Sequence, residues 1–311
     1  MKTIREIYGE ALAELGAENK NIVVLDCDVS SSTRSELFAK AYPERFFNFG
    51  IAEGNMAAAA AGMALAGKTA FINTFAFLLA LRAADPIHGL IAHGNLNVKI
   101  MGAYAGLSDS YDGASHQSAE DIAVMRAIPN MTAITVCDGY QTRAAVRACA
   151  DYPGPVYVRL SRNEMPDVYK QGGEFKIGRA NILKRGSDVT LIGCGLMTSR
   201  CIAAAEELKT AGINAEVIDM HTVKPFDRPA VIESVGKTGA AVAAEEHSVI
   251  GGLGSAVAET LAAYFPAPLE MVGIADKFGE SGEYAALLEK YGLGVNDIVN
   301  AAKRVILRKR G

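Results

Sequence analysis

Side chains that can do chemistry are concentrated in four short segments of the 311-residue sequence. In the first, residues 46–56, Glu53 follows an aromatic run and precedes an alanine-rich stretch. A carboxylate at the start of a helix is favoured by the helix dipole. The Phe, Ile and Ala residues around Glu53 would also exclude water and raise the pKa of its carboxyl. Glu53 is therefore either a helix-terminal residue or a group that exchanges protons.

The second segment, residues 73–78, places Phe75 and Phe77 at the end of an expected strand. Packing in the core is the common role of such aromatic side chains. At a strand end, however, they can also form a wall on which a planar heterocycle stacks. Both roles agree with the sequence alone.

The third segment, residues 106–117, is a polar, glycine-containing loop that carries Asp112 and His116. A lone histidine in a loop is usually solvated or held by a structural hydrogen bond. An aspartate and a histidine four residues apart favour acid–base work, because histidine titrates near neutral pH and loops often carry function. The fourth segment ends an expected strand with Arg162, which forms either a surface ion pair or an anchor for a phosphate or sulfonate group.

The elements that must position these residues alternate between short β-branched runs and helical patterns, which predicts an α/β fold with parallel strands. In open parallel sheets, ligands bind at the carboxyl ends of the strands, where the four segments fall. The expected strands of the first half are 22–26, 45–50, 69–75, 98–104, 131–138 and 155–161, and the expected helices are 4–15, 35–41, 54–66, 78–91 and 140–150.

The chain is longer than one hydrophobic core usually serves. A turn-rich stretch also divides it into two parts. We predict two domains, 1–165 and 177–311, joined by a linker over 166–176. Each is expected to be a mainly parallel β-sheet flanked by helices. In the second domain the expected strands are 189–195, 215–220, 240–245 and 269–274, and the expected helices are 198–211, 227–235, 254–264 and 297–307.

Composition excludes several classes of protein. The net charge is −4 and the basic residues are scattered, so a nucleic-acid partner is not expected. The longest near-apolar stretch, residues 56–67, is too short to span a bilayer, and the N-terminus lacks the features of a signal peptide. The five cysteines show no Cys-x-x-Cys spacing and are expected to be buried free thiols. We predict a cytoplasmic protein without a membrane partner and without metal ligands of its own.

Three of these segments, in this order, resemble the C-terminal half of a transketolase. They are Asn48-Phe-Gly-Ile-Ala-Glu53, Thr74-Phe75 and Asp112-Gly-Ala-Ser-His116-Gln, with support from Lys224-Pro-Phe and Glu245-Glu-His-Ser-Val-Ile-Gly-Gly-Leu-Gly254. The resemblance covers essentially the whole chain and implies a pyrimidine-binding domain followed by a transketolase C-terminal domain. It further implies thiamine-diphosphate-dependent transfer of a two-carbon ketol unit from a ketose donor to an aldose acceptor.

The resemblance implies a set of cofactor contacts. Glu53 matches the glutamate that hydrogen-bonds N1′ of the aminopyrimidine of thiamine diphosphate, a contact that supports deprotonation of the cofactor. Phe75, with Phe77 or Leu78, matches the aromatic wall on the pyrimidine ring. Asp28 matches an aspartate that lies close to the cofactor.

The resemblance also implies substrate contacts. His116 matches the histidine that moves protons on the hydroxyls of donor and acceptor, and Asp112 matches the aspartate that recognises an acceptor hydroxyl. Arg5, Ser32 and Arg162 match positions that hold the phosphate tail of the sugar. These residues imply a sugar substrate with an anionic tail.

Three features depart from the family pattern. Tyr104 stands where the family often has a further histidine on the substrate phosphate, so a tail that differs in position or chemistry, as in another phosphosugar or a sulfosugar, stays open. Tyr111 replaces an acidic residue that is common beside Asp112. The Gly-Asp-Gly segment that binds diphosphate and Mg²⁺ in full-length transketolases does not occur, so the resemblance implies an N-terminal partner subunit that carries these ligands, in an α2β2 assembly.

Other functions agree with the same residues. One is half of a 1-deoxyxylulose-5-phosphate synthase, which uses a similar Asp-Gly-x-x-His-Gln loop. Another is the β subunit of a 2-oxo acid dehydrogenase, whose loop pattern fits less well. From a different class comes a non-catalytic binding or regulatory protein on the same fold, which the joint presence of Glu53, Asp112 and His116 disfavours.

Overall fold

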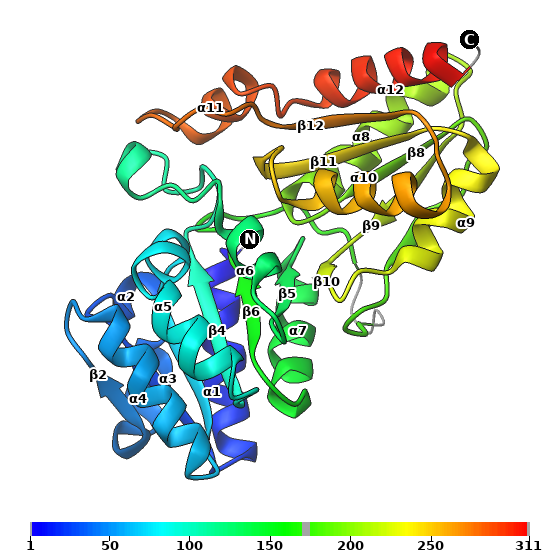
Figure 1. Cartoon of the computed structure of the whole chain (residues 1–311). Helices are drawn as coiled ribbons and strands as arrows, with labels where there is room; N and C mark the ends of the chain where they lie inside the picture. The colour runs from blue at the N-terminus through cyan, green and yellow to red at the C-terminus, as the bar shows by residue number, and fades with distance from the viewer. Residues whose placement is uncertain (1, 170–174, 310–311) are drawn as a thin grey trace.

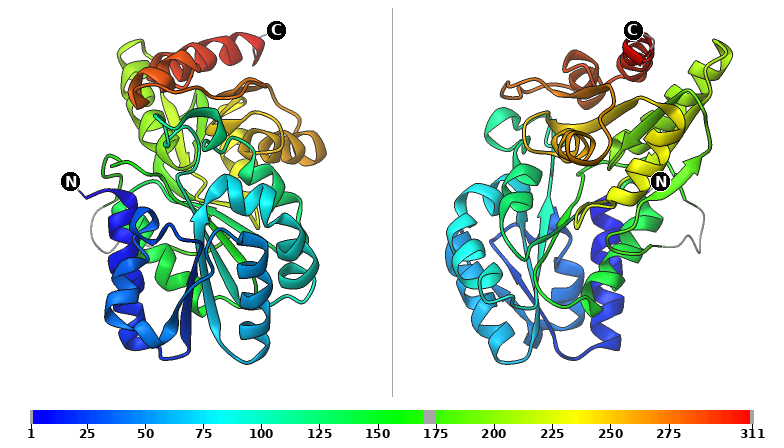
Figure 2. Two further views of the ribbon diagram at one scale, coloured as in Figure 1. Left: turned by 90° about the vertical axis from the view of Figure 1, so that its left-hand side faces the viewer. Right: turned by 45° about the vertical axis from the view of Figure 1, so that its right-hand side comes forward.

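The computed structural model of the chain describes residues 2–169 and 175–309. Within these residues the chain forms two sheets, each covered by helices on both faces (Figure 1). In Figure 2 the sheet of the first half lies below that of the second, and helix α12 (Val295–Lys309) runs along the outer side of the second. The predicted α/β fold class with two mainly parallel sheets is confirmed.

The first sheet has the strand order β10-β5-β6-β4-β3-β1-β2. Neighbouring strands are parallel except for β10, which runs antiparallel to β5. Because helices cover both faces of the central strands, their apolar runs are continuous rather than alternating. The strands are β1 (Ile22–Asp26), β2 (Phe46–Asn48), β3 (Thr69–Phe75), β4 (Val98–Ala103), β5 (Thr132–Thr135), β6 (Val156–Arg159) and β10 (Thr222–Lys224).

Helices on the two faces of this sheet enclose separate apolar clusters. One face packs against α1 (Ile4–Glu18), α3 (Glu36–Ala41) and α7 (Gly139–Asp151). Short α2 (Ser30–Thr33) precedes α3. The other face packs against α4 (Glu53–Leu65), α6 (Asp121–Ala127) and the segment 78–92. Thr3 and Glu6 form a capping box that begins α1 at the edge of the sheet where β1, β3 and β4 end.

The sequence predicts one helix over residues 78–91, and this prediction is wrong. Two π-helical stretches, Leu78–Arg82 and Ile87–Ala92, flank the short helix α5 (Ala84–Pro86). Pro86 explains the break, because proline lacks an N–H and its ring clashes with the carbonyl four residues earlier. Such π segments are frequent at functional sites.

The second sheet has the strand order β12-β11-β8-β9-β7, with only β7 antiparallel among its described strands. Helices α8 and α12 cover one face, and α9 and α10 cover the other. Helix α11 (Tyr284–Lys290) lies before α12. The remaining bounds are β7 (Asn181–Lys184), β8 (Val189–Gly193), α8 (Leu196–Thr210), β9 (Ala215–Asp219), α9 (Arg228–Thr238), β11 (Ala241–Ser248), α10 (Leu253–Tyr264) and β12 (Leu269–Ile274).

The two halves of the chain are joined by more than the expected linker. Strand β10 comes from the second half but pairs with β5 of the first sheet, and the Thr135 amide donates to the carbonyl of His221 at 2.9 Å. At the start of the linker, the amides of Val168 and Tyr169 donate to Asp138 at 2.8 and 2.6 Å. Residues 170–174 of the linker lie outside the described residues.

The cysteine prediction is confirmed, since all five cysteines are buried free thiols. Within residues 2–169 and 175–309, none of the helices combines the length and apolar character needed to cross a bilayer.

Candidate active site

The residues singled out from the sequence follow the carboxyl ends of the parallel strands in the first sheet. Because α1 precedes β1, its N-terminus lies at the same edge, and the Ile4 amide donates to the Asn163 carbonyl beyond β6 at 3.2 Å. This contact brings Arg5 to the edge. The residues at or just after strand ends are Asp28 after β1, Glu53 after β2, Phe75 as the last residue of β3, Tyr104 after β4 and Arg162 after β6.

Glu53 is the first residue of α4 and is only 2% exposed. One nitrogen of Arg82 lies 3.2 and 3.3 Å from its two carboxylate oxygens, and the Arg82 side chain is 55% exposed. The charge of Glu53 acts on its surroundings: burial raises the pKa of the Cys27 thiol to about 12, and the carboxylates of Glu53 and Asp26 add to that rise. Glu53 is thus a buried carboxylate whose partner is a solvent-exposed side chain.

Asp28 connects the ends of β1 and β2. Its backbone amide donates to the side-chain oxygen of Asn48 at 3.0 Å, and the Asn48 amide group donates to its carboxylate at 3.1 Å. Its φ of 63° lies in the left-handed region, which aspartate tolerates better than most residues. Asp28 itself is exposed at the rim of the site.

Three aromatic rings and an imidazole meet at the ends of β3 and β4. Phe75 stacks on Tyr104 with ring centroids 4.7 Å apart and an angle of 12° between the rings. The His116 ring lies 5.9 Å from Phe75 and 5.7 Å from Phe77. The neighbouring Leu78 is buried. The structure therefore brings the expected aromatic wall and the expected histidine together.

Tyr104 lies between two arginines. A guanidinium nitrogen of Arg5 donates to the Tyr104 hydroxyl at 2.6 Å and to the carbonyl of Ser32 at 3.2 Å. The Arg5 and Arg162 guanidinium groups are 5.5 and 5.1 Å from the centre of the Tyr104 ring. Two guanidinium groups around one ring form a cationic site suited to an anion.

Sequence reasoning missed Asp109, which pairs with Arg162. Its carboxylate is fully buried, and one of its oxygens has no hydrogen-bond partner. Burial and the nearby charge of Asp112 raise the pKa of Asp109, while Arg162 opposes the rise. A Ser-Asp-Ser run in a polar loop carries no sequence signal for this pairing. Arg82, the partner of Glu53, was missed because nothing in the expected helix 78–91 links it to a residue 29 positions earlier.

Asp112 and His116 lie on one loop, residues 106–118, which we call the substrate loop. Gly106 and Ser118 form a two-stranded bridge that closes its base. His116 is half-buried, and its Nδ1 lies 3.0 Å from the Ser115 hydroxyl. Asp112 is exposed, and among the described residues no hydrogen bond joins it to His116. The loop thus presents a histidine to the aromatic rings and a carboxylate to solvent.

Side chains that could bind a metal ion do not cluster in the described structure. Within the part of the chain that the structure describes, no three His, Cys, Asp or Glu side chains are grouped so that they could hold a metal ion. Among these described residues there is therefore no cluster of side-chain ligands that would hold Mg²⁺ by itself.

The carboxyl edge of the first sheet thus holds the buried Glu53, the stacked rings of Phe75 and Tyr104, and the loop that carries His116. The family described as "Transketolase, pyrimidine binding domain" matches residues 1–167, and "Transketolase, C-terminal domain" matches residues 178–298. The chain belongs to the transketolase family, as the resemblance implied, and this family uses thiamine diphosphate.

Relatives and a solved structure match all or almost all of the chain. The structure titled "Split gene transketolase, inactive beta4 tetramer" superposes with a TM-score of 0.94 at 50% identity and covers 100% of both chains. The 6-deoxy-6-sulfo-D-fructose transketolase subunit of Clostridium sp. (strain MSTE9) is 42% identical over 98% of this chain and 95% of its own length. An apulose-4-phosphate transketolase subunit of Phocaeicola vulgatus is 37% identical over 97% of each.

Proposed function

We propose that this chain is the C-terminal subunit of a split transketolase that transfers a two-carbon ketol unit from a ketose donor to an aldose acceptor. The observation that carries the proposal is one edge of a parallel sheet at which the buried Glu53, the stacked Phe75 and the loop residue His116 are all positioned. A planar cofactor and a sugar both find the groups they need at this edge.

The cofactor end of the site fits thiamine diphosphate. Glu53 is shielded from solvent and is the first residue of a helix, so it can hold a proton at N1′ of an aminopyrimidine. Phe75 and Phe77 offer ring faces, Leu78 offers an apolar edge, and Asp28 lies at the rim. When bound, the cofactor supplies the electron sink for carbon–carbon cleavage, and the protein supplies orientation and protonation.

The sugar end of the site fits a substrate with an anionic tail. His116 moves protons on the sugar hydroxyls, and Asp112 accepts a hydrogen bond from an acceptor hydroxyl. The tail lies among Arg5, Ser32 and Arg162, next to the Tyr104 ring. A guanidinium fork matches the oxygens of both phosphate and sulfonate, and two relatives are named for a sulfo sugar and a sugar phosphate.

The remaining ligands are assigned to a partner. We place the diphosphate and Mg²⁺ ligands on an N-terminal transketolase subunit, because the described residues offer no metal-binding group. The side chains of Ile51 and Leu81 are 79% and 60% exposed, close in sequence to Glu53 and Arg82, and they supply apolar surface for that subunit. Two copies of each subunit around a twofold axis form the natural closed assembly. The five free thiols favour the cytoplasm.

The test is to mix this chain with the neighbouring gene's product, provided that it carries Gly-Asp-Gly and a downstream Asn, in thiamine diphosphate and Mg²⁺. We expect ketol transfer from ketose donors to aldoses with phosphate or sulfonate tails. Decarboxylation of pyruvate without ketol transfer would instead identify a deoxyxylulose-phosphate synthase or a 2-oxo acid dehydrogenase. Cofactor binding with no turnover on either substrate class would leave a non-catalytic binding protein.

A further inference from the structure

A buried carboxylate of the second sheet reaches into the first domain. Glu246, in β11, is 4% exposed and takes no part in the proposed chemistry. One of its oxygens accepts the backbone amide of Leu107 in the substrate loop at 2.7 Å, and the other accepts the Tyr284 hydroxyl at 3.0 Å. A hydrogen bond to a charged acceptor is among the stronger ones that a protein makes.

Gly106 makes this close approach possible. Its φ of +64° lies in the left-handed region, and a Cβ built on it would lie 2.4 Å from a Glu246 oxygen. Any side chain at this position would push the carboxylate away from the loop. The backbone of the substrate loop is therefore shaped to receive Glu246.

A buried cation holds the other end of the loop. The amides and carbonyls of Gly106 and Ser118 exchange two hydrogen bonds of 2.9 Å. Arg159 donates to the Ser118 carbonyl at 3.1 Å and to the Glu246 carbonyl at 2.8 Å, and it is paired with the buried Asp121 at 2.8 Å. The base of the loop thus lies between a buried carboxylate and a buried guanidinium.

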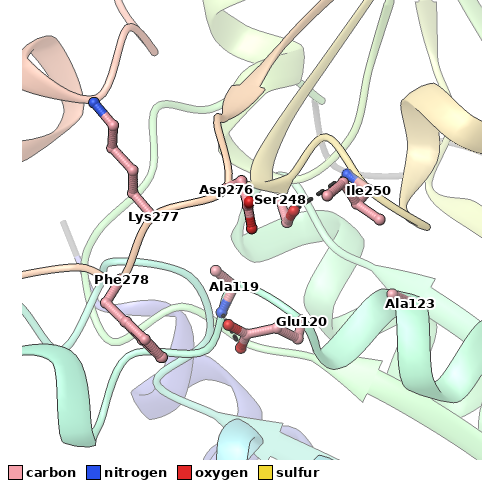
Figure 3. Close-up of a pocket in the computed structure, with 8 residues that line it drawn as sticks. All are labelled: Ala119, Glu120, Ala123, Ser248, Ile250, Asp276, Lys277 and Phe278. Atoms are coloured by element: carbon pink, nitrogen blue, oxygen red, sulfur yellow. Dashed lines mark hydrogen bonds between the residues drawn. The ribbon is translucent and has the colours of Figure 1, made fainter.

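The second domain also supports the middle of the loop through polar contacts. The Gly282 amide donates to the Ser110 carbonyl at 2.9 Å, and the Gln117 side chain donates to the Glu280 carbonyl at 3.0 Å. Beside these contacts the two domains leave a cavity of about 300 Å³ (Figure 3), lined by Ala119, Glu120, Ala123, Ser248, Ile250, Asp276, Lys277 and Phe278. Hydrogen bonds from the second domain thus hold the substrate loop beside this cavity.

We propose that Glu246 is a positioning residue, which fixes the substrate loop from the second domain and so places His116 and Asp112 against the sugar. The catalytic meaning of this role rests on the proposed function. The cofactor contacts of Glu53 and Phe75 come from other elements of the first sheet. Loss of the Glu246 contact should therefore impair the handling of sugars and spare the binding of cofactor.

The first test is hydrogen–deuterium exchange on the full-length chain, which needs neither partner nor cofactor. In Glu246→Ala, backbone amides of residues 105–118 should exchange at least tenfold faster than in the wild type. Glu246→Gln should restore slow exchange, because its amide oxygen still accepts from Leu107 and its NH₂ group can donate to the Tyr284 oxygen. Unchanged exchange in Glu246→Ala would overturn the proposal.

Glu245→Ala is the matched control. Glu245 is the preceding residue and is 1% exposed, but it accepts the amides of Leu253 and Gly254 at the start of α10. Equal acceleration of the loop in Glu245→Ala would show general loosening and also overturn the proposal. If Glu246→Ala does not fold, Tyr284→Phe removes one of the two bonds that orient the carboxylate, and loop exchange identical to the wild type would then count against the proposal.

The second test uses the reconstituted enzyme. For Glu246→Ala, kcat/KM for sugars should fall at least tenfold, while the dissociation constant of thiamine diphosphate stays within twofold and Glu246→Gln recovers most of the loss. An equal fall in Glu245→Ala, or a matching loss of cofactor affinity, would contradict the positioning role. If the wild-type pair shows no ketol transfer, the proposed function fails, while the exchange experiment still decides whether Glu246 positions the loop.

Discussion

Glu53 and Glu245 are both buried carboxylates beside the start of a helix, but their partners differ. Glu245 accepts two backbone amides at 2.7 Å, so its hydrogen-bonding capacity is met by groups that cannot leave. Among the described residues, Glu53 accepts side-chain hydrogen bonds only from Arg82, which is exposed. A buried acceptor that depends on an exposed side chain is available to a ligand. This difference, rather than burial itself, distinguishes the candidate catalytic carboxylate from the structural one.

Glu53→Gln should leave the fold intact and abolish most ketol transfer by the reconstituted enzyme. An amide of the same shape cannot hold a proton at N1′ of the cofactor in the way a carboxylic acid can. The lost ion pair has one exposed partner, so the free energy of unfolding should change by no more than about 1 kcal/mol. Thermal unfolding and steady-state turnover measure the two effects. Near-normal turnover would mean that Glu53 is only a helix-terminal residue.

Tyr104 combines a strained backbone with two cationic neighbours. Its φ is +60°, which is uncommon for a bulky side chain, and such strain often occurs at functional sites. The ring stacks on Phe75, and its hydroxyl accepts a hydrogen bond from Arg5. The proposed tail site therefore consists of two arginines and a phenol, and its cationic charge is partly balanced by Asp109, which pairs with Arg162.

Tyr104→His should raise kcat/KM for sugars with a phosphate tail relative to the same sugars with a sulfonate tail. An imidazole can carry a positive charge, and a phosphate dianion gains more from an added cation than a sulfonate monoanion. Tyr104→Phe is the control, since it releases Arg5 without adding charge and should leave the ratio within twofold. A ratio that does not move in Tyr104→His would place Tyr104 outside the tail site.

Apolar runs and local motifs were predictable from the sequence, whereas several short elements were not. The strands β1, β3 and β4 appear as continuous apolar runs, because both faces of each are covered. Strands β7 and β10 are four and three residues long and lie outside any longer apolar run, and β10 pairs with a strand 88 residues earlier (Thr222 with Ile134). The short helices α6 and α11 were missed for the same reason.

Contacts across the two domains were also beyond prediction. Glu53, Phe75 and His116 belong to local motifs whose residue types and spacing indicate chemistry. Glu246 carries no such signal, because its bond to Leu107 joins residues 139 positions apart. A pair of adjacent glutamates gives no hint that one faces a helix start and the other a loop of the first domain.

The junction between α7, the linker and α8 contains a buried acid that should give the fold a distinct pH dependence. Asp219 accepts hydrogen bonds from Gln141 and Tyr169 at 2.6 Å and from Thr198 at 3.0 Å. Burial nevertheless raises its pKa from 3.8 to about 6. The folded state thus binds more protons than the unfolded state between these two pH values, so Asp219 lowers the free energy of unfolding as the pH rises through them.

Asp219→Asn should remove this dependence. The variant loses hydrogen bonds to donors at every pH, so the informative quantity is the difference in free energy of unfolding between wild type and variant. As the pH rises from 4 to 7, the free energy of unfolding of the wild type should fall relative to that of the variant by up to about 3 kcal/mol. Urea unfolding at several pH values measures it. Two curves that stay parallel across this range would show that Asp219 keeps an ordinary pKa.

At the scale of the whole molecule, several large apolar side chains around the first sheet are exposed. Leu65 of α4 and Leu81 of the segment 78–92 are 75% and 60% exposed, and the two segments contact each other. Ile51, before α4, is 79% exposed. A related chain with the same fold is titled an inactive β4 tetramer of a split transketolase. Exposed apolar side chains on this half of the chain suit association with the proposed partner subunit or, without it, with further copies of this chain.

We therefore expect the isolated chain to be a homo-oligomer that binds thiamine diphosphate weakly and transfers no ketol groups, and to become active when the N-terminal subunit converts it into a mixed assembly. Native mass spectrometry follows the exchange of partners, and calorimetry with cofactor and Mg²⁺ follows binding. Leu81→Glu should weaken both assemblies, because burial of an unpaired charge in an interface is unfavourable. Leu307→Glu is the matched control, since Leu307 is 69% exposed on α12 of the other domain and should leave assembly unchanged. Robust ketol transfer by the chain alone would contradict the division of the active site between two subunits.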